Sequence, residues 1–444
     1  MFYTVAMNGL IERYKSFLDE GKTERECVRR TIALAEANGY RRLESVESLK
    51  CGDKVYVEDY EKAIALFHIG SEPMEKGMNI LGAHIDSPRL DIKMNPLYES
   101  EGLVYLDTHY YGGIKKYQWV AMPLAIHGVV VKTTGEKINV VLGEEDDEFT
   151  FTISDILPHI AQEQMKKSAG EFIPGEDLDL VVGLGERDEE GKSKAKEAIL
   201  SILKEKYDIE EKDFLSSELE VVPAGKAKYL GLDSSMVLGY GQDDRICAFT
   251  SLEALLEGKT EKRTSVCILV DKEEIGSTGA TGMDSRFFEN ATAEVLAAMG
   301  LTSSLSLRRT LKNSMMLSSD VNSAYDPLNT SLYDKKNSSY LSGGVVFNKY
   351  TGSRGKSGAS DANPEFIGKI RGVMDKNGVK YQMAELAKVD VGGGGTIAKF
   401  SAYYGMSVID CGVSILSMHA PWEISSVKDI EEAKNAYKAF LTLE

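Results

Sequence analysis

Five apolar runs in this chain each lead into an acidic residue or a histidine, and this repeated pattern constrains the fold more than any other feature. The residues at the ends of these runs are His84, Asp243, the pair Glu273 and Glu274, Asp320, and His419. Apolar runs of this length, followed by turn signals, are typical of buried strands. In an open α/β sheet, functional side chains gather beyond the carboxyl ends of the strands. We therefore expect an α/β fold in which these positions lie close together.

The pattern of predicted secondary structure changes twice along the chain. Residues 1–92 and 231–444 alternate helical and strand patterns, whereas residues 93–230 contain short β-rich runs split by turns. The simplest interpretation is a discontinuous α/β domain with a mixed sheet, made of 1–92 and 231–444, and interrupted by an inserted, mainly β domain at 93–230.

Charge and cysteine content exclude several classes of function. Lys and Arg number 52 against 69 Asp and Glu, and the resulting net charge of −17 argues against binding to nucleic acid or to an anionic membrane surface. The five cysteines include no CxxC pair, so neither a disulfide framework nor a thiolate zinc site is expected. The amino terminus lacks the features of a signal peptide, and no long uncharged apolar run predicts a membrane span. These features together favour a cytoplasmic protein.

The residues that end the apolar runs are the right types to bind divalent metal ions. Zn²⁺, Mn²⁺ and Co²⁺ accept imidazole and carboxylate ligands. Five such ligands exceed what one zinc ion needs, and they suit two ions bridged by a carboxylate. We assign His84 and Asp320 to one ion. Glu274 and His419 are assigned to the other ion, and Asp243 bridges the two.

Three further carboxylates lie next to these ligands in the sequence. Asp244 is the alternative to Asp243 as the bridge. Glu273 and its neighbour point in different directions on an extended backbone, so one can hold metal while Glu273 acts as general base on a metal-bound water. Asp86 lies two residues after the histidine and therefore shares its face of a strand. We expect Asp86 to orient that imidazole from behind.

Seven motifs in this order resemble the M18 family of metalloaminopeptidases, of the aspartyl aminopeptidase and aminopeptidase I type. The motifs are His84-Ile-Asp86-Ser-Pro-Arg-Leu, Tyr111-Gly-Gly-Ile, Gln242-Asp243-Asp244-Arg245, Asp271-Lys-Glu273-Glu274-Ile-Gly276-Ser, Ser319-Asp320, Gly394-Gly-Thr-Ile397 and Leu416-Ser-Met-His419. The resemblance implies an enzyme with two metal ions, usually zinc, that removes the N-terminal residue of peptides. It also implies a catalytic α/β domain, an inserted dimerisation domain, and homodimers assembled into a tetrahedral dodecamer.

The substrate pocket departs from the family pattern. After the Asp320-type ligand, aspartyl aminopeptidases carry two histidines where this chain has Ser323 and Asp326. The resemblance offers Lys349 and Lys356 as competing candidates to pair with a substrate carboxylate. It also makes His159 the candidate histidine that reaches a neighbouring subunit's active site. The preferred N-terminal residue, acidic or neutral and hydrophobic, stays open.

Two other functions are compatible with the same residues. A carboxypeptidase or deacylase with two metal ions would use the same ligands and differ in which end of the substrate must be free. A catalytically silent assembly protein could retain the scaffold alone. Glu273 argues against the silent protein, because a binding protein has no need of a base beside the water.

Overall fold

The chain divides into two units in the computed structural model, which describes residues 9–144, 149–191 and 193–444. Of the described residues, the first unit takes 9–86, 227–418 and 423–444, and the second takes 87–144, 149–191, 193–226 and 419–422. The sequence predicts domain boundaries after residues 92 and 230, whereas the structure divides the chain a few residues earlier at both places. The short segment His419–Trp422 also belongs to the second unit.

A nine-stranded mixed sheet forms the centre of the first unit. In sheet order its strands are β1 (Arg41–Arg42), β2 (Lys54–Asp59), β3 (Ala63–His68), β13 (Thr264–Val270), β4 (Met78–His84), β14 (Met315–Ser319), β18 (Ser407–Gly412), β16 (Val345–Asn348) and β17 (Tyr381–Met383). The four strands from β13 to β18 are parallel, and β3 and β16 flank them in the antiparallel sense. The predicted α/β fold with a mixed sheet is therefore confirmed.

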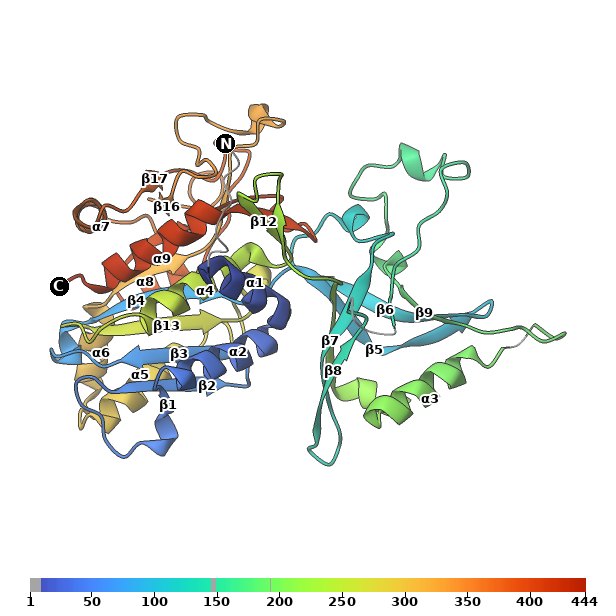
Figure 1. The fold of residues 1–444 in the computed structure, drawn as a ribbon, viewed down its shortest axis with the longest axis horizontal. Helices are drawn as coiled ribbons and strands as arrows, with labels where there is room; N and C mark the ends of the chain where they lie inside the picture. The colour runs from blue at the N-terminus through green and yellow to red at the C-terminus, as the bar shows by residue number, and fades with distance from the viewer. Residues whose placement is uncertain (1–8, 145–148, 192) are drawn as a thin grey trace. The chain divides into compact units, whose positions relative to one another are not determined.

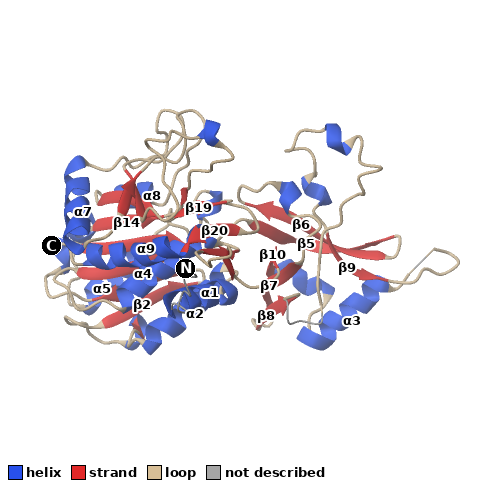
Figure 2. Cartoon of the chain, turned by 45° about the horizontal axis from the view of Figure 1, so that its top comes forward, coloured by secondary structure: helices blue, strands red, loops and turns tan. Residues whose placement is uncertain are grey.

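Helices cover both faces of this sheet, because the side chains of a buried strand alternate between two apolar cores. In β13, Cys267 and Leu269 join one core, whereas Val266 and Ile268 join the other. The first core is closed by α1 (Gly9–Glu20), α2 (Glu24–Ala37), α4 (Gln242–Leu256), α7 (Pro364–Asn377) and α9 (Val427–Leu441). The second is closed by α5 (Phe287–Ala298), α6 (Ser304–Lys312) and α8 (Ala398–Ala402). Figures 1 and 2 show α4 and α9 lying side by side across the first face.

The turn between α1 and α2 is fixed by local hydrogen bonds. Thr23 caps α2 with a capping box, in which its hydroxyl accepts from the Glu26 N–H and its own N–H donates to the Glu26 carboxylate. In the same turn, the carbonyl oxygen of Lys22 accepts a 2.8 Å hydrogen bond from the buried guanidinium of Arg245. The amino-terminal helices are thereby tied to the first turn of α4.

A small five-stranded sheet lies beside the large one in the first unit. Its strands, in sheet order, are β11 (Lys228–Leu230), β12 (Met236–Gly239), β20 (Glu423–Ser426), β19 (Ser414–Leu416) and β15 (Asn322–Ser323). A two-residue turn joins β12 to α4, and β20 runs directly into α9. This sheet therefore holds the start of α4, where Asp243 lies.

The second unit is built on a six-stranded antiparallel sheet. Its strands, in sheet order, are β8 (Lys137–Leu142), β7 (Leu124–Val131), β10 (Ser217–Pro223), β5 (Arg89–Ser100), β6 (Leu103–Tyr111) and β9 (Leu180–Leu184). Helix α3 (Ala195–Tyr207) packs against this sheet. The unit is mainly β, as the sequence predicts. Among the helices of the described residues, none combines the length and apolar character needed to cross a bilayer.

Candidate active site

The carboxyl ends of neighbouring strands and the start of α4 bring five of the predicted site residues together. His84 ends β4, the pair Glu273 and Glu274 follows β13, and Asp320 follows β14. Two groups of ligand atoms result, each with its atoms within 4.8 Å of one another: His84 with Glu273 and Asp320, and His84 with Asp243 and Glu274. Five of the six positions expected to converge therefore meet within the first unit, and His419 is the exception.

His84 lies at the centre of both groups and is almost fully buried. Its Nε2 atom is 3.3 Å from Asp243 Oδ1 and 3.8 Å from Asp320 Oδ1. Burial of the ring lowers its pKa, but the hydrogen-bonding carboxylates of Asp243, Asp320 and Asp86 outweigh burial and raise the pKa well above its usual value. The surroundings of His84 therefore favour a positive charge at this point.

Asp86 joins the histidine to the turn that carries the two glutamates. The Nδ1 atom of His84 lies 3.0 Å from the Asp86 carbonyl oxygen and 3.3 Å from its carboxylate. The same carboxylate accepts hydrogen bonds from the backbone N–H groups of Glu273, at 3.1 Å, and Glu274, at 3.2 Å. One buried carboxylate thus sets the position of two strand ends, and it directs Nε2 of His84 toward the other acidic groups.

The two glutamates lie on a single tight turn, a 3₁₀ helix that spans Glu273–Ile275. Lys272 precedes it at φ +67° and Gly276 ends it at φ +99°, a conformation that glycine adopts without strain. Burial, followed by the negative charge of Asp320, raises the pKa of Glu273 to about 8. This carboxyl can therefore exchange a proton near neutral pH.

The paired aspartates at the start of α4 differ in their surroundings. The peptide bond between Asp243 and Asp244 is cis, and the Asp243 N–H donates to the carboxylate of Glu423 at 3.0 Å. Asp243 belongs to a ligand group, whereas Asp244 belongs to neither group of the described residues. Asp244 is fully buried, and burial followed by the charge of Asp320 raises its pKa well above the usual value.

Behind the glutamate turn lies a buried ion-pair cluster. Lys62 Nζ is 2.8 Å from Glu24 of α2 and 3.3 Å from Asp271, which directly follows β13. Asp271 also accepts a 2.8 Å hydrogen bond from the Thr281 hydroxyl. All three charged side chains are at most 8% exposed. The cluster links α2 to the strand end from which the Glu273 turn begins.

His419 belongs to the second unit. Its Nδ1 atom lies 2.9 Å from the carbonyl oxygen of Gly113, within the Tyr111-Gly-Gly-Ile motif. A Cβ atom at Gly113 would come within 3.3 Å of this ring nitrogen, so a residue without a side chain suits the contact. His419 is in neither ligand group of the described residues. Its assignment as a metal ligand remains a prediction from the sequence.

The predicted substrate-binding residues are exposed. His159 lies in the loop between β8 and β9, Lys349 follows β16, and Lys356 occupies a surface loop. Lys356 is 3.4 Å from Asp361 and lies over the ring of Tyr350. None of the three belongs to the ligand groups found among the described residues. Their roles remain predictions.

The two positions that depart from the family pattern have local partners. The Ser323 hydroxyl lies 3.0 Å from that of Tyr333. The carboxylate of Asp326 accepts a 2.9 Å hydrogen bond from the Leu328 N–H and a 2.6 Å hydrogen bond from the Asn329 side chain, as in a turn-forming aspartate.

Sequence reasoning missed three residues that support the site. Gln242, fully buried, receives a hydrogen bond from Tyr14 of α1, and Glu423 holds the N–H of Asp243. No spacing rule connects residues so far apart in the chain. The one available signal is that Glu423 is a charged residue in a short strand directly before a helix.

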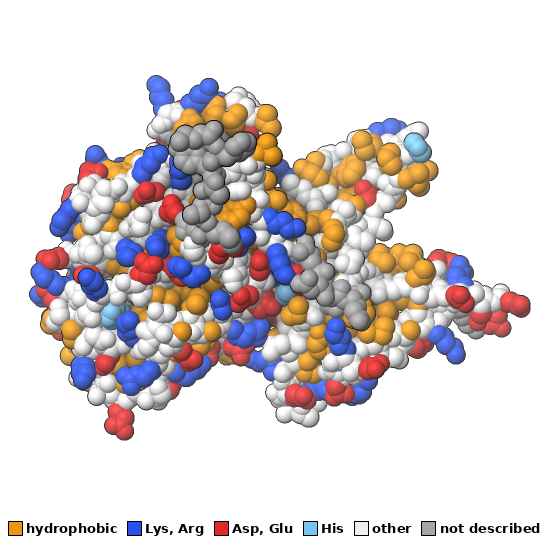
Figure 3. Space-filling model, viewed as in Figure 1, with side chains coloured by type: hydrophobic (Ala, Val, Ile, Leu, Met, Phe, Trp, Pro, Cys, Tyr) orange, Lys and Arg blue, Asp and Glu red, His pale blue; other side chains and the backbone are white. Residues whose placement is uncertain are grey.

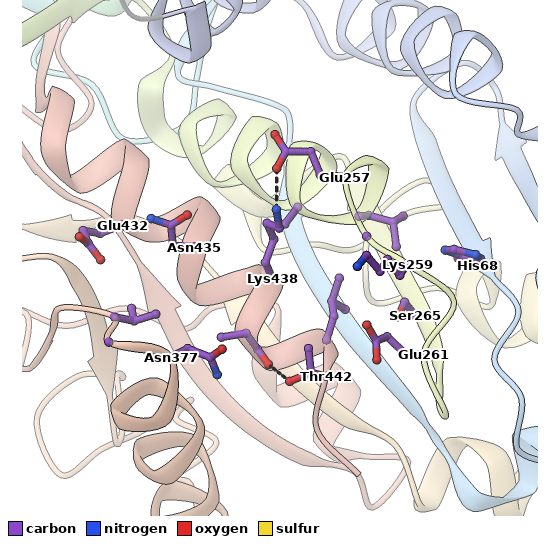
Figure 4. A pocket seen from close by; sticks show the side chains of 17 residues that line it. His68, Glu257, Lys259, Glu261, Ser265, Asn377, Glu432, Asn435, Lys438 and Thr442 are labelled. Atoms are coloured by element: carbon purple, nitrogen blue, oxygen red, sulfur yellow. Dashed lines mark hydrogen bonds and ion pairs between the residues drawn. The ribbon is translucent and has the colours of Figure 1, made fainter.

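A cavity of about 400 Å³ in the first unit lies elsewhere (Figure 4). It is lined by residues at the carboxyl ends of α4, α7 and α9 and by His68, and no predicted site residue contributes to it. Glu257 and Lys438 point toward one another beside it and form a 2.7 Å ion pair. The candidate active site is identified by its chemistry, because the groups of ligand atoms around His84 lie outside this cavity.

The donor set fits divalent metal ions. One imidazole and several carboxylates share a small, partly buried volume, and mutual repulsion contributes to the raised pKa values of Glu273 and Asp244. A divalent cation between the oxygens would offset that repulsion. Imidazole with carboxylate oxygens is a ligand set that zinc accepts.

Comparison with known proteins places the chain in one family. The family model described as Aminopeptidase I zinc metalloprotease (M18) matches residues 17–441. The probable M18 family aminopeptidase 1 of Clostridium acetobutylicum is 58% identical over 435 residues, which cover 97% of this chain and 94% of that protein.

Solved structures show the same fold. The crystal structure of the M18 family aminopeptidase from Thermotoga maritima superposes with a TM-score of 0.92 at 41% identity, covering 97% of this chain and 95% of that one. The crystal structure of aminopeptidase I from Clostridium acetobutylicum superposes with a TM-score of 0.90 at 56% identity, with the same coverage of both chains. The more distant mApe1 dodecamer from yeast shares the fold, with a TM-score of 0.78 at 21% identity over 97% of this chain and 96% of that one. The chain belongs to the M18 family of zinc metalloaminopeptidases.

Proposed function

We propose that this aminopeptidase uses two divalent metal ions, with Glu273 as the general base, to hydrolyse the first peptide bond of its substrates. The observation that carries the proposal is the pair of ligand groups that share His84. The two groups together offer one imidazole and four carboxylates, which is more than a single ion needs and suits two neighbouring ions, with His84 on one of them. Membership in an aminopeptidase family favours this activity over the carboxypeptidase, deacylase and silent-assembly alternatives.

The proposed ligands are those of the sequence analysis: His84, Asp243, Glu274, Asp320 and His419. In the structure, Asp243 and Glu274 share one group with His84, and Asp320 shares the other with Glu273. Asp243 is the carboxylate nearest to His84 Nε2, which supports it over Asp244 as the bridge. His84 and His419 both direct Nδ1 at a carbonyl oxygen, so Nε2 is the nitrogen each would offer to a metal.

The protein groups supply proton transfer and orientation. Bound zinc ions would polarise the peptide carbonyl and lower the pKa of water, as Lewis acids do. Glu273 takes the proton from the attacking water and passes it to the leaving amine. Burial raises the pKa of Glu273, which makes its carboxylate a better proton acceptor than an exposed glutamate. Asp86 holds the Glu273 backbone and the His84 ring in their relative positions.

A panel of blocked peptides tests the proposed function. We expect release of the first residue from peptides with a free N-terminus, no release after N-acetylation, and little effect of amidating the C-terminus. Zinc content per chain, measured after dialysis, should approach two ions. Activity on N-acetylated peptides, or full activity with a single ion per chain, would contradict the proposal.

Substrate preference is the least constrained part of the proposal. Lys349 and Lys356 are the candidate partners for an acidic N-terminal residue, and His159 is the candidate contribution from a neighbouring subunit. Substrates beginning with Asp, Glu, Leu, Ala or Lys separate acidic from neutral preference. Loss of activity on acidic substrates alone in Lys349→Met or Lys356→Met would identify the lysine that binds the acidic group.

We also propose that the chain forms homodimers that assemble into a tetrahedral dodecamer. The mApe1 structure from yeast is a dodecamer and shares this fold. In the second unit, the loop between β8 and β9 exposes Ile156, Leu157, Ile160 and Met165, and Figure 3 shows apolar side chains on this part of the surface. Exposed apolar clusters of this kind mark protein contacts. Light scattering should give the mass of twelve chains, and a monomer would contradict the assembly.

A reducing compartment, the cytoplasm, is the proposed location. All five cysteines are free thiols, and four of them are buried.

A further inference from the structure

The side chain of Gln242 sits directly beside the proposed bridging ligand and makes every hydrogen bond available to it. Its Oε1 atom accepts from the Tyr14 hydroxyl at 3.0 Å and from the Ser425 hydroxyl at 2.5 Å. Its Nε2 atom donates to the carbonyl oxygens of Val237, at 3.3 Å, and Glu423, at 2.6 Å. A primary amide has two acceptor and two donor positions, so this one is saturated.

These partners come from three separate elements of the first unit. Tyr14 lies on α1, Val237 on β12, and Ser425 and Glu423 on β20. Gln242 and Ser425 are fully buried, as is the ring of Tyr14, which packs 5.4 Å from Phe249 of α4. A buried amide with four partners on three elements has one orientation only.

The same strand also holds the neighbouring backbone. The Glu423 carboxylate accepts a hydrogen bond from the Asp243 N–H at 3.0 Å, while the carbonyl of Glu423 accepts from Gln242. The backbone of Asp243 is therefore fixed directly by Glu423 of β20. It is also fixed indirectly by α1, because Tyr14 holds the preceding residue, Gln242. Its carboxylate lies 3.3 Å from His84 Nε2.

We propose that Gln242, held by Tyr14 and by Ser425, is a positioning residue that aims the Asp243 carboxylate at the metal ions. This inference rests on the proposed function, and it assigns α1 a part in metal binding although α1 supplies none of the proposed ligands. Groups that orient a metal ligand from behind typically change metal affinity by 10–100-fold when they are lost.

Two substitutions remove the donors to Gln242 without touching any proposed ligand. Tyr14→Phe deletes one hydroxyl and keeps the ring, and Ser425→Ala deletes the other. Tyr40→Phe is the matched control, because its buried hydroxyl has no hydrogen-bond partner among the described residues and it packs in the same apolar core. All three variants lose one buried hydroxyl each.

The test uses the full chain, stripped of metal and titrated with Co²⁺, whose visible absorption depends on its coordination geometry. We expect Co²⁺ to bind about tenfold more weakly to Tyr14→Phe than to the wild type. It should bind about 100-fold more weakly to the double variant that combines Tyr14→Phe with Ser425→Ala. The absorption bands should shift in both, and kcat should fall at saturating metal while KM for the peptide stays constant. Tyr40→Phe should keep the wild-type affinity and spectrum.

The outcomes separate this inference from the proposed function. Wild-type Co²⁺ affinity and spectrum in the double variant would overturn the positioning role, as would an equal change in Tyr40→Phe. If Tyr14→Phe and Tyr40→Phe lower the melting temperature equally but only Tyr14→Phe changes the spectrum, the role is supported. A wild-type chain that binds no Co²⁺ would instead overturn the proposed function.

Discussion

Two buried histidines lie on the two strands that flank β13, beside its opposite ends, and their surroundings have opposite electrostatic effects. His68 of β3 is the partner of Ser265 at the start of β13, whereas His84 of β4 is the partner of Val270 at its end. The two residues are 4% and 1% exposed. Both side chains are therefore almost fully shielded from solvent, although His68 borders the cavity of Figure 4.

Their pKa values nevertheless move in opposite directions. Burial lowers the pKa of His68, and the charge of Lys54 lowers it further. Burial also opposes charge on His84, but the carboxylates of Asp243, Asp320 and Asp86 raise its pKa well above the usual value. The comparison shows that a buried histidine does not make a cation site. The surrounding carboxylates make the cation site, and they are what distinguishes the end of β13 from its start.

Removing the metal should have the largest effect on activity. With chelator, release of N-terminal residues should fall to background and return when Zn²⁺ is added. The melting temperature should also fall, because ligand at 100 times its Kd stabilises a protein by about 2.7 kcal/mol. His68→Gln should respond to chelator as the wild type does, since His68 lies beside the other end of β13. Unchanged turnover in chelator would contradict a metal site at His84, and the two ends of β13 would then not differ in function.

Glu273→Gln should have the next largest effect on catalysis. We expect kcat to fall by about 10²–10⁴, because the general base is lost, while the metal content per chain stays the same. The matched control is Glu261→Gln, which changes a glutamate beside the His68 cavity and should leave kcat unchanged. Metal analysis and steady-state kinetics check both variants. Normal turnover in Glu273→Gln would show that another group is the base.

Lys62→Met tests buried charge behind the glutamate turn. It leaves Glu24 and Asp271 buried without their lysine, and we expect a loss of about 3–5 kcal/mol in the free energy of unfolding. Lys438→Met, at the cavity, removes a partner of the half-exposed Glu257 and should cost about 0–1 kcal/mol. Denaturant unfolding of the metal-free proteins measures both. Equal losses would mean that burial does not separate the two ion pairs.

The smallest expected effect is the contribution of His68 to the pH dependence of the free energy of unfolding. Its pKa in the folded chain lies below the unfolded value of about 6.5, so the unfolded state binds more protons as the pH falls. The stability that neutral His68 contributes is present above about pH 6.5 and is lost below it. Between about pH 7.5 and 5.5, metal-free His68→Gln should lose less stability than the wild type. An equal or greater loss in the variant would show that the pKa of His68 is not lowered.

The strands were predictable because parallel strands buried on both faces appear as continuous apolar runs. β4, β13 and β14 follow this rule, and the residues at their ends converge as expected. The last run was harder to interpret. Ser407 to His419 looks like one strand, but the structure divides it between β18 of the large sheet and β19 of the small sheet. His419 therefore lies beyond a short strand of the small sheet and belongs to the second unit.

The supporting contacts were not predictable from local pattern. Tyr14 and Gln242 are 228 positions apart, and neither residue type at either position signals a partner. The same holds for Glu423, whose contact with Asp243 spans 180 positions. Spacing and alternation describe neighbours in one element, whereas these hydrogen bonds depend on how separate elements pack.

Anomalous diffraction at the zinc absorption edge, from crystals of the zinc-loaded protein, tests the central claim most directly. We predict two zinc peaks about 3.5–4 Å apart, bound by His84, Asp243, Glu274, Asp320 and His419. A single peak, or peaks away from His84, would contradict the proposal of two ions at the end of β4.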